Sequence, residues 1–584
     1  MKSVQLSTGK RELIRPLKRA VKSYGEKYFM VLDVETEVLS DGTHKFLFAY
    51  VLEYHPTRRK FKNLKEKIEK CSRLHFFRSQ ERLTHFLFNP NRWAKKTRLI
   101  FGHNITYDLK FLKFDIPKKL GFKLKRLMLN PTFITFVNKK MDFRVTFLDT
   151  FNFYKTSLEK LFPEEKVSID FKEYDYSNLS LLKKRCKIDV LLTARLVHNL
   201  KGISASDMSF KIFRTKNVYI QKIETPIAKQ SYYGGRVECY INNLRVENVK
   251  YYDFNSLYPS VMKGNLFPIK FIQTLDNLSV KTVKELIRRK FFLFAEVEVN
   301  VPEDVKIPPF PFRGKDGKLY FPVGKFVTYL ASPEIELGLE LGYIIRFIKV
   351  EQYYSKDIFS EFVEEYYKLR QQYPELKEYY KLILNSLYGK FGQREHETKI
   401  IETDDFNFIG KISVEEGEYY VFNGYGFETR TVDKRKYNVA IASAVTSYAR
   451  VKLYKLMQSI NFDVVYCDTD SVFTVKKLET SKELGALKLE CEGTFLGFRA
   501  KAYIIKDKVK FKGGKVSLQL LQEGREEIIV SMKSFPTFRQ FIKNKGVVKN
   551  VEIVKRFNLI DDKRKGKGIT EPYSVEELMQ KWKK

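Results

Sequence analysis

A short acidic turn between two apolar runs constrains the fold of this 584-residue chain more than any other segment. The stretch Phe462 to Val475 reads FDVVYCDTDSVFTV, in which β-branched and aromatic residues flank Asp468-Thr469-Asp470. These flanks predict a β-hairpin with the two acids at its tip. Two carboxylates so close together repel each other, and a pair of hard divalent cations would relieve the repulsion. The alternative is a solvated turn, in which Asp and Thr are common.

A second acidic segment supplies a third carboxylate, which a two-metal site at this hairpin would need. The stretch VKYYDFNSLYPSVM predicts a β-strand that ends at Asp253, followed by a break at Pro259. Tyr258 brings a bulky ring close to Asp253 in the chain, and such a ring could exclude a ribose 2′-hydroxyl. The alternative for Tyr258 is a place in the hydrophobic core.

One predicted helix carries side chains that suit a nucleoside triphosphate. In YYKLILNSLYGKFGQ, Lys381, Asn385 and Tyr388 recur at i, i+4 and i+7 and would share one stripe of the helix. Two glycines then end the predicted helix. A lysine meets phosphate as a point charge, and the tyrosine ring could flank a base. The alternative is an ordinary amphipathic helix with a mixed exposed face.

A separate set of acids lies in the first two hundred residues. The apolar run YFMVLDVE predicts a buried strand, on which Asp33 and Glu35 project to the same side. In FGHNITYDLKFL, Asn104 and Asp108 are four apart and would share one helix face. Asp189 lies among apolar residues of a later helical segment. The four carboxylates are enough to hold two metal ions, an arrangement that hydrolyses phosphodiesters.

Three short segments suit contact with nucleic acid. Tyr232-Tyr233-Gly234-Gly235 contains paired glycines, which let the main chain approach another molecule closely. Lys501 and Tyr503 are two apart and would point the same way on a strand. Ser157-Leu158 either starts a helix, with Ser157 as its cap, or holds the end of a single strand.

Composition favours a polyanionic partner and several domains. The chain has 107 Lys and Arg against 70 Asp and Glu, and a net charge of +37 favours binding to phosphates. Its five cysteines are scattered without metal-binding spacing, which is typical of a reducing cytoplasm. We find no apolar run long enough to span a bilayer, so a membrane partner is not expected. The length predicts several domains, each with its own core.

At these motifs the chain resembles family B DNA polymerases, and more narrowly their protein-primed, phi-29-type group. The polymerase motifs are similar to DFNSLYPS at 253–260, KLILNSLYG at 381–389, YCDTDS at 466–471, KAY at 501–503 and YYGG at 232–235. The proofreading motifs are similar to DVET at 33–36, HNITYD at 103–108, SLEKL at 157–161 and the helix with Asp189. They occur in the order of the family.

The resemblance implies a role for each of these positions. Two magnesium ions per site, replaceable by manganese, would be held by catalytic carboxylates, namely Asp253, Asp468 and Asp470 in one site and Asp33, Glu35, Asp108 and Asp189 in the other. The incoming nucleotide would contact Phe254, Leu257, Tyr258, Lys368, Arg370, Lys381, Asn385 and Tyr388. DNA would contact Thr36, Asn104, Tyr107, Ser157, Leu158, Tyr232, Gly234, Gly235, Lys501 and Tyr503. Lys368 and Arg370 are alternatives for one phosphate-binding cation.

The implied fold class is a multidomain α/β and α+β chain, in which a ribonuclease-H-like 3′-5′ exonuclease precedes a right-hand polymerase. The expected divisions are a basic extension (1–27), the exonuclease (28–200), palm (201–260), a first insertion (261–357), fingers (358–393), a second insertion (394–435), palm (436–525) and thumb (526–584). In the family the first insertion helps contact a priming protein. The second closes a ring around DNA and supports processive strand displacement.

The resemblance also implies partners and leaves alternatives. Primer-template DNA, deoxynucleoside triphosphates and a terminal priming protein are the expected partners of a monomer. The alternatives are a family B polymerase that extends ordinary primers, a nucleic-acid-binding protein without catalysis, and a stand-alone nuclease.

One position departs from the family, because Arg185 stands where a tyrosine usually precedes the third proofreading aspartate by four residues. That departure puts the strength of hydrolysis in question.

Overall fold

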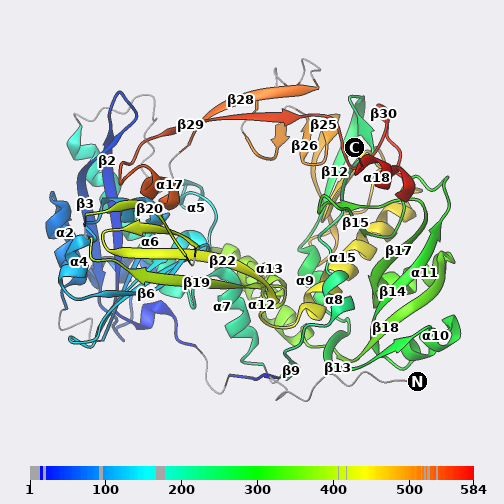
Figure 1. Cartoon of the computed structure of the whole chain (residues 1–584), viewed down its shortest axis with the longest axis horizontal. Helices are drawn as coiled ribbons and strands as arrows, with labels where there is room; N and C mark the ends of the chain where they lie inside the picture. Colours follow the sequence, from blue (N-terminus) through cyan, green and yellow to red (C-terminus); the bar gives the residue numbers. More distant parts are fainter. Residues whose placement is uncertain are drawn as a thin grey trace.

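The structure is a computed structural model. It describes residues 13–17, 21–90, 96–165, 178–216, 218–405, 407–415, 417–506, 508–514, 516–517, 521, 526–534 and 537–583. Of the predicted basic extension 1–27, residues 1–12 and 18–20 lie outside this description. Figure 1 shows two lobes, with the N-terminal sheet in one and a second large sheet in the other.

The first lobe is built on a seven-stranded mixed sheet. Its strands, in spatial order, are β4 (Ser72–Phe77), β3 (His44–Tyr54), β2 (Phe29–Val38), β5 (Thr97–Gly102), β8 (Phe143–Asp149), β7 (Thr132–Asn138) and β6 (Lys123–Leu129). The pairs β2–β5 and β5–β8 are parallel, and the others are antiparallel. The long helix α6 (Leu179–Asn199) packs against β2 and β3, so its Asp189 and the acids of β2 face one region. The predicted strand and late helix are confirmed.

The second lobe is built on a seven-stranded antiparallel sheet. Its strands, in spatial order, are β10 (Val237–Cys239), β23 (Tyr466–Asp468), β24 (Ser471–Thr474), β12 (Arg245–Phe254), β25 (Leu487–Arg499), β26 (Ala502–Ile505) and β27 (Lys508–Phe511). The hairpin predicted around the Asp-Thr-Asp turn is therefore present as β23 and β24. The buried helix α15 (Val439–Ser459) supports it, because residues such as Leu453 join the same core as Cys467 and Val472.

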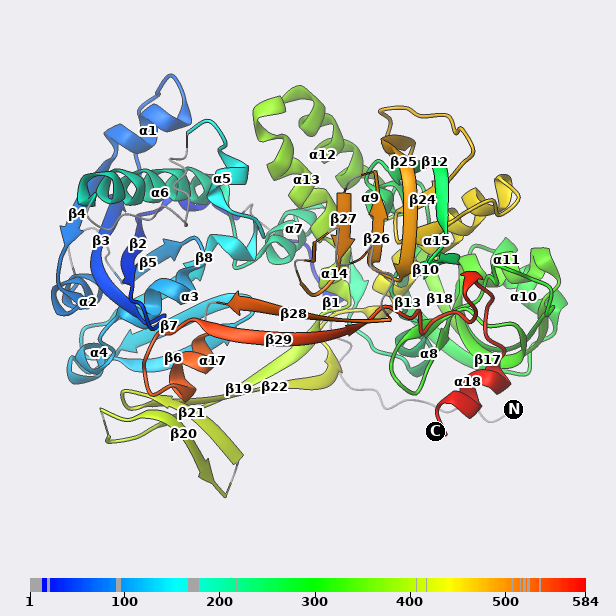
Figure 2. The same cartoon turned by 90° about the horizontal axis from the view of Figure 1, so that it is seen from above.

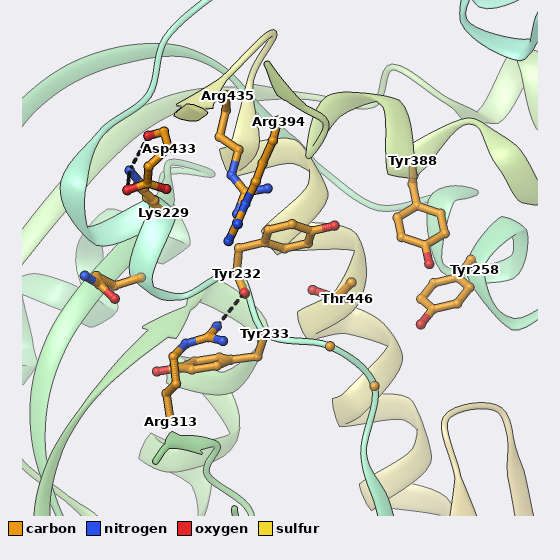
Figure 3. Close-up of a pocket in the computed structure, with 13 residues that line it drawn as sticks. Lys229, Tyr232, Tyr233, Tyr258, Arg313, Tyr388, Arg394, Asp433, Arg435 and Thr446 are labelled. Carbon is orange, nitrogen blue, oxygen red and sulfur yellow. Dashed lines mark hydrogen bonds and ion pairs between the residues drawn. The ribbon is translucent and has the colours of Figure 1, made fainter. Parts of the chain in front are cut away.

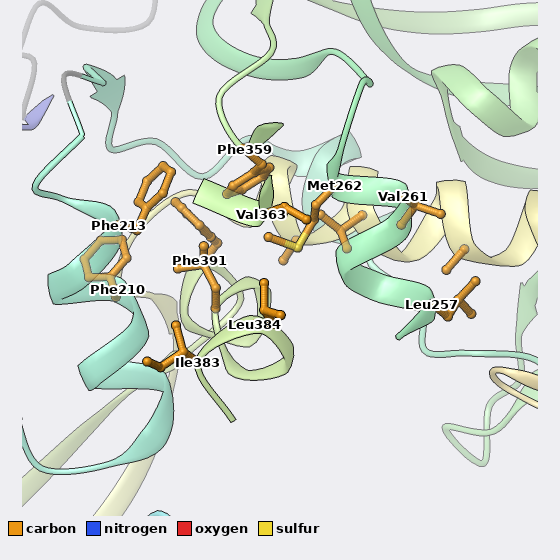
Figure 4. Packing of buried hydrophobic residues seen from close by; sticks show 14 of the residues in the cluster. Phe210, Phe213, Leu257, Val261, Met262, Phe359, Val363, Ile383, Leu384 and Phe391 are labelled. Carbon is orange, nitrogen blue, oxygen red and sulfur yellow. The ribbon is translucent and has the colours of Figure 1, made fainter. Parts of the chain in front are cut away.

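A helical group connects the two lobes on one side. It consists of α7 (Ala205–Phe213), α9 (Leu257–Met262), α12 (Ser360–Gln372), α13 (Lys377–Ser386) and α14 (Tyr388–Phe391). Figure 4 shows how these helices share one core, in which Phe213 and Phe391 meet Ile383 and Met262. This core holds the helix with Lys381 in place beside the strand with Asp253.

Two smaller antiparallel sheets are inserted between these elements. The first has the order β13 (Phe267–Asp276), β18 (Ile344–Lys356), β14 (Phe292–Val301) and β17 (Gly324–Ala331). The second has the order β19 (Arg394–Glu402), β22 (Tyr425–Arg435), β21 (Gly417–Phe422) and β20 (Ile409–Val414). The second sheet reaches the first lobe, where Lys118 and Lys123 form ion pairs with Glu402.

The C-terminal segment crosses from one lobe to the other. The ribbon of β28 (Glu527–Ser534) and β29 (Val551–Asn558) extends between the lobes in Figures 1 and 2, and α17 (Phe538–Lys543) lies at its far end. There Phe538 joins the core of the first lobe. His44 of β3 is bound on both sides, because its ring contacts the Asn550 side chain at 2.9 Å and the Tyr107 hydroxyl at 2.7 Å.

The structure differs from the predictions at Asn104 and Pro259. Asn104 does not share a helix face with Asp108, because α3 spans only Ile105–Asp108 and Asn104 precedes it in the left-handed region, at φ 68°. The strand predicted to end at Asp253 ends at Phe254, so Pro259 is not what breaks it; Pro259 lies in the first turn of α9, where a missing N–H costs no helical bond.

Two further local predictions also differ from the structure. Gly389 lies inside α14, which begins at Tyr388, whereas the helix of Lys381 ends at Ser386; Leu387 between them keeps helical dihedral angles. Lys501 is not on a strand, because it occupies a left-handed turn at φ 66° before β26, whereas the ring of Tyr503 on β26 is buried. At Lys501 the difference is a single left-handed residue, which residue periodicity does not signal.

A buried Arg–Glu–Arg network (Arg236, Glu238 and Arg564) joins the second lobe to the C-terminal segment. Arg236 Nε donates to Glu238 Oε2 at 2.6 Å, and Arg564 Nη1 lies 3.4 Å from Glu238 Oε1. The two guanidinium groups also donate to the carbonyls of Pro308 and Lys306. Burial alone would raise the pKa of Glu238, but the two arginines hold it below its ordinary value. The network therefore keeps a charge inside the protein by pairing it on both sides.

Asp561, beside this network, should make stability depend on pH. Burial raises its pKa to about 6, whereas an unfolded Asp titrates near about 4. The folded state thus binds more protons between these values, so its stabilisation falls as pH rises through this window and is lost above about pH 6. Because Asp561→Asn cannot ionise, we expect its stability relative to wild type to rise by about 3 kcal/mol from pH 4 to pH 7. Urea unfolding of both proteins at each pH measures this difference, and parallel curves would contradict the prediction.

Candidate functional site

The structure brings three acids from distant segments to one end of the second sheet. Asp253 lies at the end of β12 and pairs with Ser471 of β24, next to the hairpin that carries Asp468 and Asp470. The Phe254 N–H donates to the Asp470 carbonyl at 2.8 Å, which ties the two acidic segments together. The three carboxylates are partly buried and belong to one cluster.

Neighbouring main chain holds the acidic turn in an unusual conformation. Thr469 has φ 61°, in the left-handed region that β-branched residues avoid. Its N–H donates to the Arg236 carbonyl at 2.7 Å, and the Asp470 N–H donates to the Asp468 carbonyl at 2.6 Å. A Cβ on Gly235 would lie 2.6 Å from the Thr469 methyl group, so a glycine is required there. Gly235, the second of the paired glycines, thus lies against the acidic turn.

The charges in this cluster repel one another. Burial raises the pKa of Asp253 to about 7, and the charges of Asp470 and Glu490 add to the effect. Burial also raises the pKa of Asp470, and Asp468 adds to it. Lys501 Nζ forms an ion pair with Asp468. An all-oxygen set of crowded carboxylates fits magnesium, because a divalent cation would relieve this repulsion.

Cationic and aromatic side chains lie next to the acids. The rings of Tyr258 and Tyr388 stack with centroids 4.3 Å apart. The charge of Lys381 reaches Asp253, because it offsets part of the rise in the pKa of that acid. Arg370 Nη1 donates to Ser256 Oγ at 3.2 Å, in the loop that follows Asp253. These contacts make a place where the phosphates of a nucleotide would meet two cations beside the acidic cluster.

The other predicted nucleotide contacts differ in their exposure. Phe254 and Leu257 are buried and support the loop from within, whereas Lys368 and Asn385 are exposed. Of the two alternatives for a phosphate-binding cation, Arg370 is therefore the one that contacts the loop after Asp253. Asn385 lies one helical turn after Lys381 on α13.

A basic and aromatic cavity of about 560 Å³ opens beside these tyrosines. Figure 3 shows Tyr258 and Tyr388 at one end, and Arg394, Arg435 and Tyr232 at the other. The Arg435 guanidinium lies 5.4 Å from the Tyr232 ring centre. Gly234 and Gly235 also line the cavity. Flat rings and guanidinium groups suit a single-stranded nucleic acid, whose bases stack and whose phosphates are anionic.

A second acidic cluster lies in the first lobe. Asp33 and Glu35 project from β2, and their carboxylate oxygens and the Cys186 sulfur all lie within 4.8 Å of one another. Asp108 is buried behind them and accepts a hydrogen bond from the Val34 N–H at 3.0 Å. Burial and the charge of Asp33 raise the pKa of Asp108. Carboxylates at this density also fit divalent cations.

Asp189 faces the same region but is engaged by its own helix. Arg185 Nε lies 3.9 Å from Asp189 Oδ2, and both side chains are mostly buried. The arginine that replaces the family tyrosine is therefore an ion-pair partner of the predicted metal ligand.

The predicted DNA contacts of this lobe surround the cluster. The hydroxyls of Thr36 and Tyr107 are 2.7 Å apart. Asn104 is exposed, and its N–H donates to the buried Asp149. Ser157 caps α5 (Leu158–Leu161) by accepting from the Lys160 N–H, while Leu158 is buried. Ser157 is thus a cap, and its exposed position also leaves room for contact with a strand.

Sequence reasoning missed Cys186, Asp149 and the Arg–Glu–Arg network. Leu182, Cys186 and Asp189 are spaced four and three residues apart, so they share one face of α6, and this spacing is a usable signal. Asp149 ends a strand, as Asp253 does, and burial raises its pKa to about 6. The network gives no local signal, because Arg564 is 326 residues from Glu238 in the chain.

Comparison with known proteins identifies close likenesses of sequence and fold. Residues 162–462 match the family described as DNA polymerase type B, organellar and viral. A probable DNA polymerase of Neurospora intermedia is 25% identical over 73% of this chain and 54% of its own length. The DNA-directed DNA polymerase of Enterobacteria phage PRD1 is 26% identical over 46% of this chain and 48% of its own. This chain thus spans about half the length of these curated relatives.

The solved structure of phi29 DNA polymerase with primer-template DNA and incoming nucleotide has the same fold. It superposes with a TM-score of 0.66 at 14% identity, over 91% of this chain and 100% of that chain. The predicted fold class, a multidomain α/β and α+β chain with a ribonuclease-H-like domain followed by a right-hand polymerase fold, is confirmed by this match. No helix among the described residues is long and apolar enough to cross a membrane.

Proposed function

Because this chain belongs to the organellar and viral family of type B DNA polymerases, we propose that it is a DNA-directed DNA polymerase with a 3′-5′ exonuclease. The observation that carries the proposal is the meeting of Asp253 with the Asp468–Asp470 turn, across more than two hundred residues, beside Lys381. Its substrates would be primer-template DNA and deoxynucleoside triphosphates. A monomer acting in the cytoplasm remains our prediction.

In synthesis, the primer 3′-hydroxyl attacks the α-phosphate of the nucleotide and pyrophosphate leaves. Asp253, Asp468 and Asp470 would hold magnesium, or manganese in its place. When bound at either carboxylate set, the metal acidifies the attacking hydroxyl or water and neutralises phosphate charge. Lys381 and Arg370 add positive charge where the triphosphate would lie.

In proofreading, water attacks the last phosphodiester of a frayed strand. Asp33, Glu35, Asp108 and Asp189 would hold the metals of this site. Thr36, Tyr107 and Asn104 would grip the sugar and base, with the first two positioned by their mutual hydrogen bond. The 3′ end of a strand would move between the polymerase site in the second lobe and the exonuclease site in the first lobe.

We assign the remaining parts by the same resemblance. The sheet of β13, β14, β17 and β18 is proposed as the first insertion, which would contact a priming protein. The sheet of β19 to β22, which reaches the first lobe, is proposed as the second, which would close a ring around DNA. The helices α12 to α14 would be the fingers, and the C-terminal ribbon would be the thumb.

The test is a primer annealed to a closed circular single strand, with deoxynucleotides, magnesium and no helper protein. We expect products far longer than one circle. Stopping at the 5′ end of the primer would contradict strand displacement, and absence of any extension would contradict the polymerase. Extension from a protein hydroxyl, assayed in parallel, decides between protein priming and ordinary primers.

Tyr258 should exclude ribonucleotides. Its ring is held in place by stacking on Tyr388, so it would press against a 2′-hydroxyl. We expect Tyr258→Val to reduce the preference for deoxynucleotides on the order of a hundredfold, as loss of a well-packed steric contact does. Single-nucleotide incorporation with each sugar gives the ratio of kcat/KM. Tyr388→Phe, which keeps the stacked ring, is the control and should keep the preference; equal loss in both variants would contradict this role.

A further inference from the structure

The acidic cluster of the first lobe contains a thiol. Cys186 of α6 is fully buried, and its sulfur lies with the carboxylate oxygens of Asp33 and Glu35 inside 4.8 Å. The thiol also lies 3.6 Å from the Asp33 carbonyl oxygen. Within the described residues, this is the single group of three His, Cys, Asp or Glu side chains whose ligand atoms all lie within 4.8 Å of one another. Two carboxylates and a sulfur are thus presented to one point.

The carboxylate expected from the same helix forms an ion pair with an arginine. Asp189 is one helical turn beyond Cys186, but Asp189 is not part of the group of three and lies 3.9 Å from the Arg185 guanidinium. Arginine is always charged, so this pair draws Asp189 along its own helix. As a result, α6 offers sulfur to Asp33 and Glu35 in the place where an oxygen donor is expected.

Donor type decides which cation such a place prefers. Magnesium takes oxygen ligands, whereas zinc and its heavier relative cadmium bind thiolate strongly and accept carboxylates as well. We propose that Asp33, Glu35 and Cys186 form a binding site for a thiophilic divalent cation, with zinc as the natural candidate. On binding, the S–H bond breaks, the sulfur–metal bond forms and the proton passes to solvent.

The site shares Asp33 and Glu35 with the proposed magnesium site, so the two cations compete. This inference deepens the proposed exonuclease and depends on the same acids. Zinc bound through Cys186 would displace magnesium from proofreading, while the polymerase acids, which have no thiol among them, would keep magnesium. A low concentration of added zinc should therefore slow degradation of single-stranded DNA more than it slows synthesis.

Cadmium alone, added to the metal-free full-length protein, provides a test that does not depend on activity. Cadmium thiolates absorb in the ultraviolet, and we expect this band to saturate at one cadmium per chain and to fade when zinc is added. Cys186→Ser should remove the band, and Glu35→Gln, which keeps the thiol, should weaken binding at least about tenfold. Cys71→Ser, which removes another thiol of the same lobe, is the matched control and should keep the band.

Each outcome decides the proposal. A band that persists in Cys186→Ser, or unchanged affinity in Glu35→Gln, would overturn it. If Cys186→Ser does not fold, as judged by its melting curve, Glu35→Gln alone decides. Wild-type protein that degrades DNA with magnesium but shows no cadmium band would keep the exonuclease and remove this site. A cadmium band in protein that does not degrade DNA would keep this site and remove the exonuclease.

Discussion

Asp468→Asn should abolish DNA synthesis and leave degradation of single-stranded DNA intact, whereas Asp33→Asn should do the opposite. The two acids lie in different lobes, Asp468 in the β23–β24 hairpin and Asp33 on β2. Loss of charge stabilisation at the reacting phosphate costs on the order of a thousandfold in rate or more. Asparagine keeps the size of each side chain, so the fold around it should persist.

Primer extension and single-strand degradation, measured on the same preparations, test this division. Asp463→Asn is the matched control, because Asp463 lies five residues before Asp468 and forms a surface ion pair with Lys476. It should retain both activities. If either active-site variant lost both activities while still folded, the two reactions would share one site.

Glu238→Ala should strongly destabilise the protein. It leaves Arg236 and Arg564 without their carboxylate partner, and both stay buried, because each side chain is only 1% exposed. Removing one partner from a buried ion pair costs about 3 to 5 kcal/mol, because the remaining charge stays out of water. The change should also slow synthesis, since the Arg236 carbonyl holds the Thr469 N–H of the acidic turn.

Chemical unfolding measures the loss. Glu285→Ala is the matched control, because Glu285 on α10 (Val280–Arg288) also bridges two arginines, Arg288 and Arg289, but on the surface. Screening by water makes such surface pairs weak, so this variant should unfold like wild type. Equal stability of the two variants would mean that the buried guanidinium groups find other partners.

The strands that carry the acids could be predicted from local patterns, whereas the fold class was implied by the resemblance of the motifs to a family. The alternation around Asp468 and Asp470 predicts the hairpin, and the apolar run before Asp33 predicts the strand, because burial imposes a period on the chain. The errors at Asn104 and Lys501 are places where one left-handed residue reverses the backbone. Such reversals depend on neighbours in space, as the bond from Thr469 to the Arg236 carbonyl illustrates.

Long-range partners lay outside local reasoning altogether. Glu238 and Arg564 are 326 residues apart, and nothing near either residue indicates the other. Cys186 could be placed on the correct face of its helix, but its nearness to Asp33 and Glu35 depends on how α6 packs on β2. The motifs therefore indicate what chemistry the chain performs, whereas the packing determines which additional groups take part.

The dependence of the acidic turn on Arg564 has a consequence for biosynthesis. A ribosome makes the first lobe early, and N-terminal domains fold first. The support for Thr469, through Arg236 and Glu238, waits until Arg564 has been translated. A growing chain would thus acquire the means to remove nucleotides well before the means to add them.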